Sequence, residues 1–271
     1  MKNSLKGRYF LISFLITFCI VTIFSFLTLV SNSSRDVLNE QSGISKNYIP
    51  TSSHDLTVLL IGEGEGRGYC LVKLCSEEMK LYAISLPSQM KINSRSLSDT
   101  QTYGGARFLK DELSAFLGVE IDRFVRVREK MFVKILDTLG AMPLKTEDDI
   151  YSFENAFSLS KGEHILPFEK VLGVIKYDTE KGEESRLNRQ TRVLCEIFNE
   201  KINDQKIPSA EDFFNMAVNL IDTDISVFDF DLRRGFADEF LKNGEAVALD
   251  VFTDDGFNLT DQSKSVIKAR F

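Results

Sequence analysis

The feature of this sequence that most constrains its fold is an uncharged apolar segment near the N-terminus. Residues 9–34 contain no Asp, Glu, Lys, Arg or His, and their centre reads FLISFLITFCIVTIFSFLTLV. An α-helix rises about 1.5 Å per residue, so roughly 20 apolar residues cross the hydrocarbon core of a bilayer. We therefore expect a transmembrane helix over residues 9–31.

The charges that precede this segment predict its orientation. Lys2, Lys6 and Arg8 come before it, and positive residues stay on the cytoplasmic side of a membrane. Residues 1–8 are then cytoplasmic, and everything after the span lies outside. A cleaved signal peptide is the alternative, with an apolar region of about 7–15 residues that ends at small residues. The run here is longer and ends in a poor cleavage site, which favours a single-pass anchor.

The remainder of the chain divides into a linker and a domain. Residues 32–54 are polar, rich in Ser and Asn, and typical of a juxtamembrane linker. Residues 55–271 are enough for one domain with its own core. Because the net charge of the whole chain is −7, and the basic N-terminus lies inside, nucleic acid is excluded as a partner of the outer domain.

Few residues are available for metal or nucleophilic chemistry. The chain has two His and four Cys, and the Cys have no metal-ligand spacing. A His-based triad or a zinc site therefore has little to draw on. If the domain is catalytic, carboxylates and guanidinium groups must carry the reaction.

The apolar patterning predicts strands and helices that alternate along the domain. Strands are expected at residues 56–61, 69–75, 81–86, 121–127 and 246–252, the first three forming a meander. Helices are expected at residues 104–117, 129–139, 168–176, 185–202, 210–221 and 227–242. This order predicts an α/β domain with a central mixed sheet and helices on both faces.

A run of arginines begins the helix expected at residues 185–202. Arg186, Arg189 and Arg192 are three residues apart, so they lean toward one face of that helix. Guanidinium groups fit phosphate oxygens, and a helix N-terminus adds free N–H groups. By spacing alone a solvated, ion-paired face is the favoured interpretation, because charged runs usually are surface.

Several motifs, taken in order, favour a ligand-binding role for these arginines over a solvated surface. They are Leu56-Thr-Val-Leu-Leu-Ile-Gly62, Leu81-Tyr-Ala-Ile-Ser-Leu-Pro87, Lys91-Ile-Asn93, Tyr103-Gly-Gly105, Gly118-Val-Glu-Ile-Asp-Arg-Phe-Val-Arg-Val127, Leu139-Gly140 and Arg186-x-x-Arg189-Gln190. Over residues 56–202 the chain thereby resembles the LytR–CpsA–Psr family of bacterial cell-envelope proteins, which also carry an N-terminal membrane helix.

The resemblance implies a fold, a reaction and a set of ligands. Such proteins transfer an anionic glycopolymer from a polyprenyl-pyrophosphate carrier to peptidoglycan or another acceptor. Arginines bind the pyrophosphate, carboxylates hold Mg²⁺, and an apolar tunnel takes the lipid. Positioning and electrostatic stabilisation dominate a reaction of this kind.

The chain keeps part of the family's site and departs from the rest. The family positions implied to bind the pyrophosphate are occupied here by Arg67, Lys176, Arg186, Arg189 and Gln190, the lysine replacing an arginine. There are three other departures. Tyr69-Cys70 replaces the family's Asp-Thr, Ser88-Gln89 replaces its Arg-Asp, and Asp178 replaces a second arginine. With these carboxylates missing, Mg²⁺ is expected only if the site has been rearranged.

Three functions remain open. The first is an envelope protein that binds a polyprenyl-phosphate or glycopolymer ligand with weak or lost phosphotransferase activity. The second is an active glycopolymer–peptidoglycan phosphotransferase with a rearranged site, dependent on Mg²⁺. The third is a non-catalytic envelope scaffold, favoured if side chains fill the region near Arg186. No residue is assigned a catalytic role.

Overall fold

The computed structural model of the chain describes residues 54–64, 68–137, 141–146, 149–152, 157–177, 182–202, 210–218 and 220–271. All of these belong to one compact unit, Pro50–Phe271. The predicted membrane span and all but the last residue of the predicted linker lie outside the described residues, as do Arg67 and Asp178. Within the described part of the chain, no helix is both long and apolar enough to cross a bilayer.

An antiparallel meander forms the centre of the sheet. Its strands are β1 (Leu56–Glu63), β2 (Gly68–Cys75) and β3 (Lys80–Leu86). Leu59 faces Leu71 across the first pair of strands, and Leu71 faces Ile84 across the second. The meander predicted from the apolar runs is confirmed, because β-branched and aliphatic residues suit a buried pleated surface.

Three further strands extend this sheet and make it mixed. They are β6 (Arg123–Arg128), β11 (Asp222–Thr223) and β12 (Glu245–Ala248). The strand order is β11-β6-β1-β2-β3-β12, with β6 parallel to β1 and β12 parallel to β3. A parallel pair needs a crossover, and the chain makes one through a long helix between β3 and β6.

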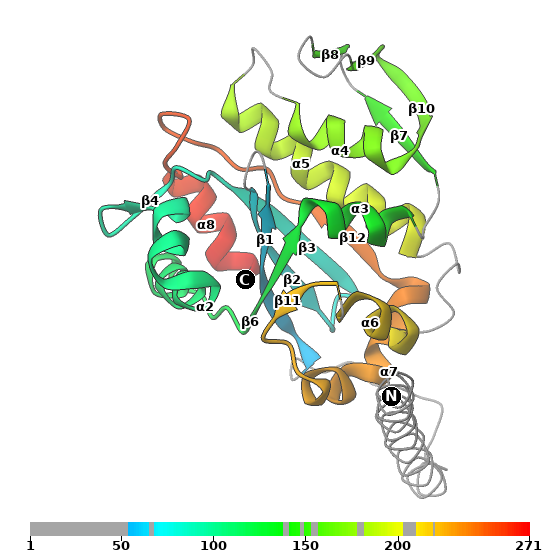
Figure 1. Cartoon of the computed structure of the whole chain (residues 1–271). Coiled ribbons are helices and arrows are strands. Elements are labelled where there is room, and N and C mark those ends of the chain that lie inside the picture. The colour runs from blue at the N-terminus through cyan, green and yellow to red at the C-terminus, as the bar shows by residue number, and fades with distance from the viewer. Residues whose placement is uncertain are drawn as a thin grey trace, which may run out of the picture. The chain divides into compact units, whose positions relative to one another are not determined.

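Helices cover both faces of the sheet, as predicted (Figure 1). One face carries Leu59, Ile61 and Leu71, which pack with α2 (Leu97–Leu117) and α8 (Asp261–Arg270). The opposite face carries Leu60 and Cys70, which belong to a cluster with Cys195. The helices on this second side are α3 (Glu129–Asp137), α4 (Phe168–Lys176), α5 (Glu183–Ile197), α6 (Ala210–Val218) and α7 (Val227–Asn243).

The start of α2 corrects one prediction. The sequence predicts a polar loop up to a helix that begins at Gly104, whereas the helix begins at Leu97. Ser96 caps it, because the Asp99 backbone N–H donates to Ser96 Oγ at 3.0 Å. Gly105, with φ of 79°, marks a kink inside the helix rather than its beginning.

Several short elements were not predicted. Two-stranded pairs join β4 (Lys91–Ile92) to β5 (Arg95–Ser96), β7 (Met142–Thr146) to β10 (Gly162–Leu166), and β8 (Ile150–Ser152) to β9 (Phe157–Leu159). Helix α8 was missed as well. The predicted helix over 185–202 is α5 followed by a π-helical turn, Phe198–Ile202. These segments are short or polar, so their periodicity carries little signal.

Candidate functional site

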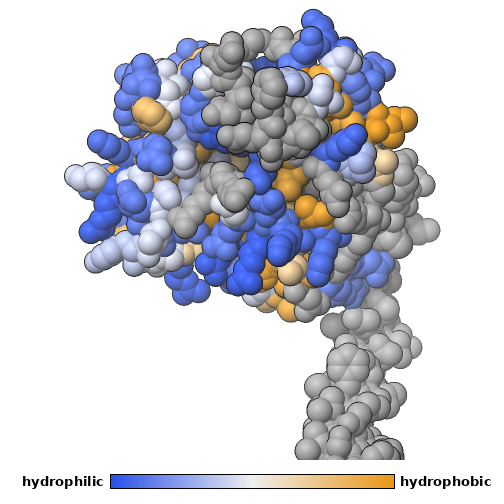
Figure 2. Space-filling model, turned by 45° about the horizontal axis from the view of Figure 1, so that its top comes forward, coloured by the Kyte–Doolittle hydropathy of each residue, from blue (hydrophilic) through white to orange (hydrophobic). Residues whose placement is uncertain are grey.

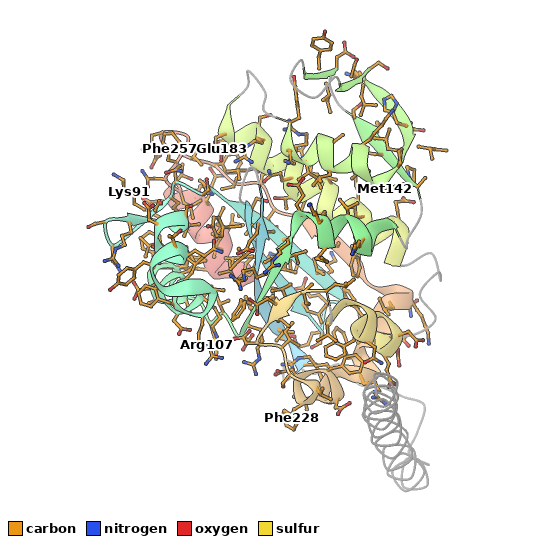
Figure 3. All side chains as sticks on the ribbon, viewed as in Figure 1. Lys91, Arg107, Met142, Glu183, Phe228 and Phe257 are labelled. Atoms are coloured by element: carbon orange, nitrogen blue, oxygen red, sulfur yellow. The ribbon has the colours of Figure 1, made fainter. Side chains whose placement is uncertain are left out.

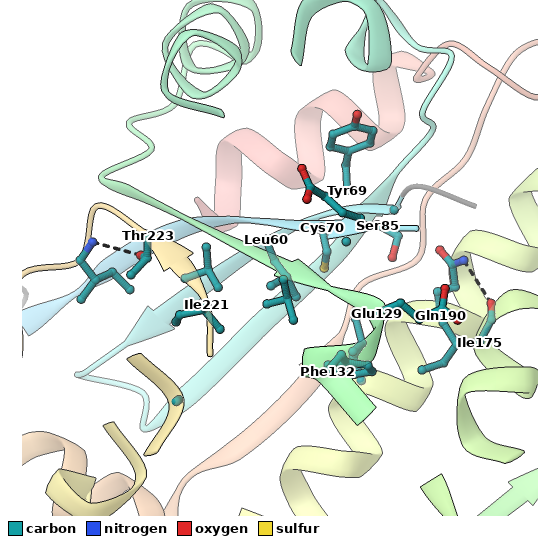
Figure 4. A pocket seen from close by; sticks show the side chains of 18 of the residues that line it. Leu60, Tyr69, Cys70, Ser85, Glu129, Phe132, Ile175, Gln190, Ile221 and Thr223 are labelled. Carbon is teal, nitrogen blue, oxygen red and sulfur yellow. Dashed lines mark hydrogen bonds between the residues drawn. The ribbon is translucent and has the colours of Figure 1, made fainter. Parts of the chain in front are cut away.

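A cavity of about 520 Å³ lies between the sheet and the helices on its second side (Figure 4). Leu60 of β1, Cys70 of β2 and Val125 of β6 are part of its sheet wall. Side chains alternate along a strand, so the neighbouring residues Leu59, Ile61 and Phe124 belong instead to the core that includes α2. Helices α3 to α7 supply the remaining walls.

The cavity wall is almost entirely apolar. Phe132 of α3 and Ile175 of α4 lie on the side away from the sheet. Phe214 of α6 and Phe230 of α7 stack with ring centroids 4.6 Å apart, and both rings line the space. An apolar wall of this kind suits hydrocarbon, because a polar ligand would lose its hydrogen bonds to water there without replacement.

Polar groups gather at one end of the cavity. Lys176, at the end of α4, forms an ion pair with Glu129 of α3, with Nζ 3.0 Å from Oε2. Glu63, at the end of β1, pairs with Arg126 of β6 at 3.1 Å. Glu63, Glu129 and Lys176 all line the cavity, so one end presents charge and the rest presents hydrocarbon.

Two of the predicted ligand-binding residues line this cavity: Lys176 and Gln190. The Gln190 amide donates to the Ile175 carbonyl at 3.1 Å, so it holds α5 against the end of α4. Lys176 and Gln190 therefore meet where the two helices adjoin.

Arg186 and Arg189 do not line the cavity but lie beside it on α5. The Arg186 guanidinium donates from Nε to Glu183 Oε2 at 2.7 Å and pairs with the same carboxylate through its terminal nitrogen. Arg189 donates from Nε to the Val174 carbonyl at 3.0 Å and also donates to the Tyr177 carbonyl. These carbonyls end α4, so Arg189 caps that helix and supports the position of Lys176.

The substituted family positions fall in three different surroundings. The Tyr69 ring lies on the packed face, where its hydroxyl donates to Gln101 Oε1 at 2.6 Å. Figure 4 shows this ring on the side of the sheet opposite Phe132. Ser88 and Gln89 form a turn after β3, with Gln89 exposed, and neither lines the cavity.

Tyr69 and Cys70 both border the cavity, but only Cys70 belongs to the cluster on the same face as Leu60. Burial raises the pKa of its thiol to about 12, and burial likewise raises the pKa of neighbouring Cys195 to about 12. Both are free, buried thiols. At neutral pH they are protonated and act as small apolar side chains rather than as nucleophiles.

The described residues do not fit a Mg²⁺ site. Among them, no group of three or more His, Cys, Asp or Glu comes together in a way that could hold a metal ion. The two carboxylates at the polar end are each paired with a cation, Glu129 with Lys176 and Glu63 with Arg126. Mg²⁺ needs carboxylate oxygens that can face it, so no step through a metal is derived from this arrangement.

Sequence reasoning missed Glu129 and the aromatic lining from α6 and α7. Glu129 was assigned only to the start of a helix, since nothing in its local pattern relates it to Lys176, which lies far along the chain. The sequence of α7 did carry a signal, because Phe230, Phe236 and Phe240 are spread more widely around the helix than one buried stripe requires. Such a helix faces more than one apolar environment.

Comparisons with known proteins give matches over most of this chain. The sequence model of the LytR_cpsA_psr family matches residues 75–248, which reaches past the segment where the motifs were recognised. The polyisoprenyl-teichoic acid–peptidoglycan teichoic acid transferase TagU of Bacillus licheniformis is 25% identical over 258 residues, covering 87% of this chain and 83% of TagU.

Solved structures share the fold. A protein of Eubacterium siraeum, described as a transcription regulator, superposes with a TM-score of 0.71 at 16% identity, covering 84% of this chain and 96% of its own. A structure of TagT bound to LIIa-WTA superposes with a TM-score of 0.62 at 17% identity, covering 83% and 92%. At these identities the likeness concerns the arrangement of the backbone.

Proposed function

The chain belongs to the LytR_cpsA_psr family, and from that premise we propose that it is a membrane-anchored, extracytoplasmic protein of the bacterial cell envelope. Its cavity binds the lipid of a polyprenyl phosphate or polyprenyl-linked glycopolymer, and its phosphotransferase activity is weak or lost. Residues 9–31 supply the single-pass anchor, with the N-terminus inside and the domain outside.

The observation that carries this proposal is a hydrocarbon-lined cavity with charge at one end only. Its volume, about 520 Å³, lies within the range of small-molecule sites, about 300–1,000 Å³. A polyprenyl chain is apolar throughout and carries its phosphate at one end. The cavity has the same asymmetry, because Lys176 lies at its polar end and the rings of Phe214 and Phe230 lie elsewhere along the wall. This hollow also argues against a scaffold without a ligand site.

Weak phosphotransferase activity is expected because the cations near the polar end of the cavity are already engaged by other groups of the protein. Lys176 is neutralised by Glu129, and Arg186 by Glu183. Arg189 is engaged by the carbonyls at the end of α4. Loss of one preorganised charge-stabilising group commonly costs about 10²–10³ in rate, so a site whose described cations are engaged elsewhere transfers poorly.

The direct test is binding of a polyprenyl phosphate to the purified full-length chain. We expect Lys176→Ala to weaken binding about tenfold, since a charge-assisted hydrogen bond contributes about 1.5–3 kcal/mol and the paired lysine delivers only part of it. Glu129→Gln should strengthen binding, because it releases Lys176. Binding of the uncharged polyprenol should not change with either variant.

The matched control is Lys134→Ala, which removes an exposed lysine from α3 away from the cavity. If Lys134→Ala and Lys176→Ala weaken binding equally, Lys176 does not contact the phosphate. If lipid extraction and mass spectrometry of the full-length chain find no polyprenyl lipid, and none binds when added, the proposed function is wrong.

The active transferase is the second candidate, and the relation to TagU favours it. It predicts turnover of a polyprenyl-pyrophosphate-linked donor that depends on a divalent cation and is lost in Arg186→Ala and Arg189→Ala. Circular dichroism must accompany Arg189→Ala, because that residue also caps α4. Turnover that is indifferent to chelator and to both substitutions would exclude this candidate.

A further inference from the structure

Helix α7 is apolar on more than one side. Phe230 and Phe240 line the cavity, and Phe236 is fully buried, with its ring 6.4 Å from that of His54. A helix on the surface of a protein in water normally has one apolar stripe and a polar remainder. The cavity and the core account for these three residues but leave others unexplained.

The unexplained residues are Val227, Phe228 and Leu232. Their exposed fractions are 65%, 75% and 50%, and all three lie in the first half of α7. Phe228 projects from the lower end of the molecule in Figure 3. We call these three residues the α7 patch.

The other exposed large hydrophobic side chains that the structure describes are scattered. Tyr103 and Phe116 are far apart along α2, and the remaining three lie on β8, on β10 and in the loop before α8: Tyr151, Ile165 and Phe257. On the face of the molecule that Figure 2 shows, the visible apolar groups are small and lie between hydrophilic side chains. Single exposed apolar residues are ordinary, whereas several on two turns of one helix indicate an interaction surface.

Charges beside the α7 patch are paired with one another. Arg234 lies 3.3 Å from Asp231 and 3.5 Å from Glu211, and Arg123 lies 2.7 Å from Asp229. Among the described residues, these basic groups next to the patch are therefore already neutralised and attract an anionic partner only weakly. The attraction of the patch is apolar, and salt should have little effect on it.

The chain reaches α7 directly from the predicted linker. Arg233 donates to the carbonyls of His54 and Asp55, at 3.0 Å each, and so holds the first described residues against the helix. A flexible chain of the predicted linker's length averages about 25–30 Å from end to end. With the anchor of the proposed function, a chain of this length would keep the beginning of the domain within reach of the bilayer.

From these observations we propose that the α7 patch inserts into the outer surface of the membrane. The occupant is the bilayer itself, and the inference rests on the membrane anchor of the proposed function. One helix then connects two apolar environments, because the patch contacts lipid while Phe230 and Phe240 of the same helix line the cavity. A carrier lipid would enter the cavity from this end, beside α6 and α7.

The test exploits the absence of tryptophan from the sequence. Phe228→Trp in the full-length chain places a single fluorophore in the patch, and Phe257→Trp places one on an exposed loop at the opposite end of the molecule in Figure 3. Both proteins are reconstituted in phosphatidylcholine vesicles with or without brominated acyl chains. We expect brominated lipid to quench most of the emission of the Phe228→Trp protein, equally at low and high salt. Emission of the Phe257→Trp protein should not change.

The outcomes separate this inference from the proposed function. If the Phe228→Trp chain remains in the vesicles and binds polyprenyl phosphate while its emission is not quenched, the membrane contact is wrong and the proposed function stands. If the emission of that variant shifts with protein concentration but is not quenched by brominated lipid, the patch contacts a second copy of the chain and the inference is overturned. If alkaline washing removes the chain from the vesicles, the anchor fails and the inference fails with it.

A second measurement does not depend on a fluorophore. Phe228→Ser with Leu232→Ser changes two exposed residues, so the fold should survive. We expect polyprenyl phosphate supplied in vesicles to load several-fold more slowly, and the same lipid supplied in detergent micelles to load normally. Equal rates from both sources would overturn the inference.

Discussion

The two faces of the central sheet are built from the same strands and differ in what they contain. On one face, Ile61 and Leu71 are fully buried against α2 and α8. On the other, Leu60 and Val125 border a cavity of about 520 Å³. A close-packed interior maximises dispersion contacts, whereas a hollow one forgoes them and remains available to a ligand. Alternation along a strand thus lets neighbouring residues belong separately to the packed core and to the cavity wall.

The largest expected effect tests whether the packed face tolerates the family's missing carboxylate. Tyr69→Asp would place a charge where the Tyr69 ring is now buried beside Gln101. We expect it to cost more than about 3 kcal/mol of unfolding free energy and to restore no transferase activity. Chemical unfolding of the full-length chain in mild detergent measures the loss.

Tyr69→Phe is the matched control, since it removes only the hydroxyl and should cost about 0.5–1.5 kcal/mol. A stable, metal-dependent Tyr69→Asp protein would show that a carboxylate at this position can turn from the packed core into the cavity.

The second prediction compares neighbouring residues of β1. Ile61→Ala should destabilise the chain by about 2–5 kcal/mol, because it leaves a void in a close-packed core. Leu60→Ala should cost less than about half of that, since its side chain already borders a hollow. The order should reverse for polyprenyl phosphate binding, with Leu60→Ala having the greater effect. If both substitutions have the same effect in both measurements, the two faces are not functionally distinct.

The third prediction concerns acid, because ion pairs hold α7 on the cavity side. Burial alone would raise the pKa of Asp229, but hydrogen bonds from Arg123 and Ser226 outweigh it and lower that pKa below its ordinary value of 3.8. A carboxyl group whose pKa is lower in the folded than in the unfolded state stabilises the fold at pH values above its unfolded pKa. This contribution is lost as the pH falls toward the folded pKa.

Asp229→Asn should therefore cost about 1–3 kcal/mol at neutral pH, toward the lower end because Arg123 is about one-third exposed. Its stability should also fall less steeply than that of the unsubstituted chain between about pH 5 and pH 3. Asp261→Asn, at a fully exposed side chain, is the control. Parallel curves for Asp229→Asn and the unsubstituted chain would contradict the assignment.

The last prediction concerns thiol reactivity and involves the smallest change in stability, since no residue is substituted. With pKa values near 12, Cys70 and Cys195 should alkylate at pH 8 at least about a thousandfold more slowly than an ordinary exposed cysteine. Peptide mapping by mass spectrometry separates them from half-buried Cys75. Bound polyprenyl phosphate should slow Cys70 further, because this residue lines the cavity. Ligand protection confined to Cys75 would place the lipid elsewhere.

Local pattern was enough for much of the fold. The apolar runs predicted the three meander strands, and the helix predicted at residues 168–176 is α4 (Phe168–Lys176). Such signals depend on periodicity within one element and need no knowledge of its neighbours. The same method failed at residues 97–103, where a Ser cap and polar residues look like a loop.

The sequence predicted less of the site, because the contacts that define it are made between different helices and strands. The sequence identified Arg186 and Arg189 near the start of one helix and Lys176 at the end of the helix before it. Only the folded arrangement pairs Lys176 with Glu129 and turns Arg189 toward the carbonyls that end α4. A long side chain interacts with whatever lies within its reach, and packing alone decides what that is.

The sequence by itself determined the family, the apolar N-terminal segment and the order of the longer strands and most helices, because each is written in contiguous or regularly spaced residues. The tertiary structure decided that one side of the sheet is filled and the other hollow, and that the Tyr69 side chain packs on the filled side while that of Cys70 packs on the hollow side. Periodicity shows that adjacent strand residues point to opposite faces, but the helices that pack there determine whether a face becomes core or binding site.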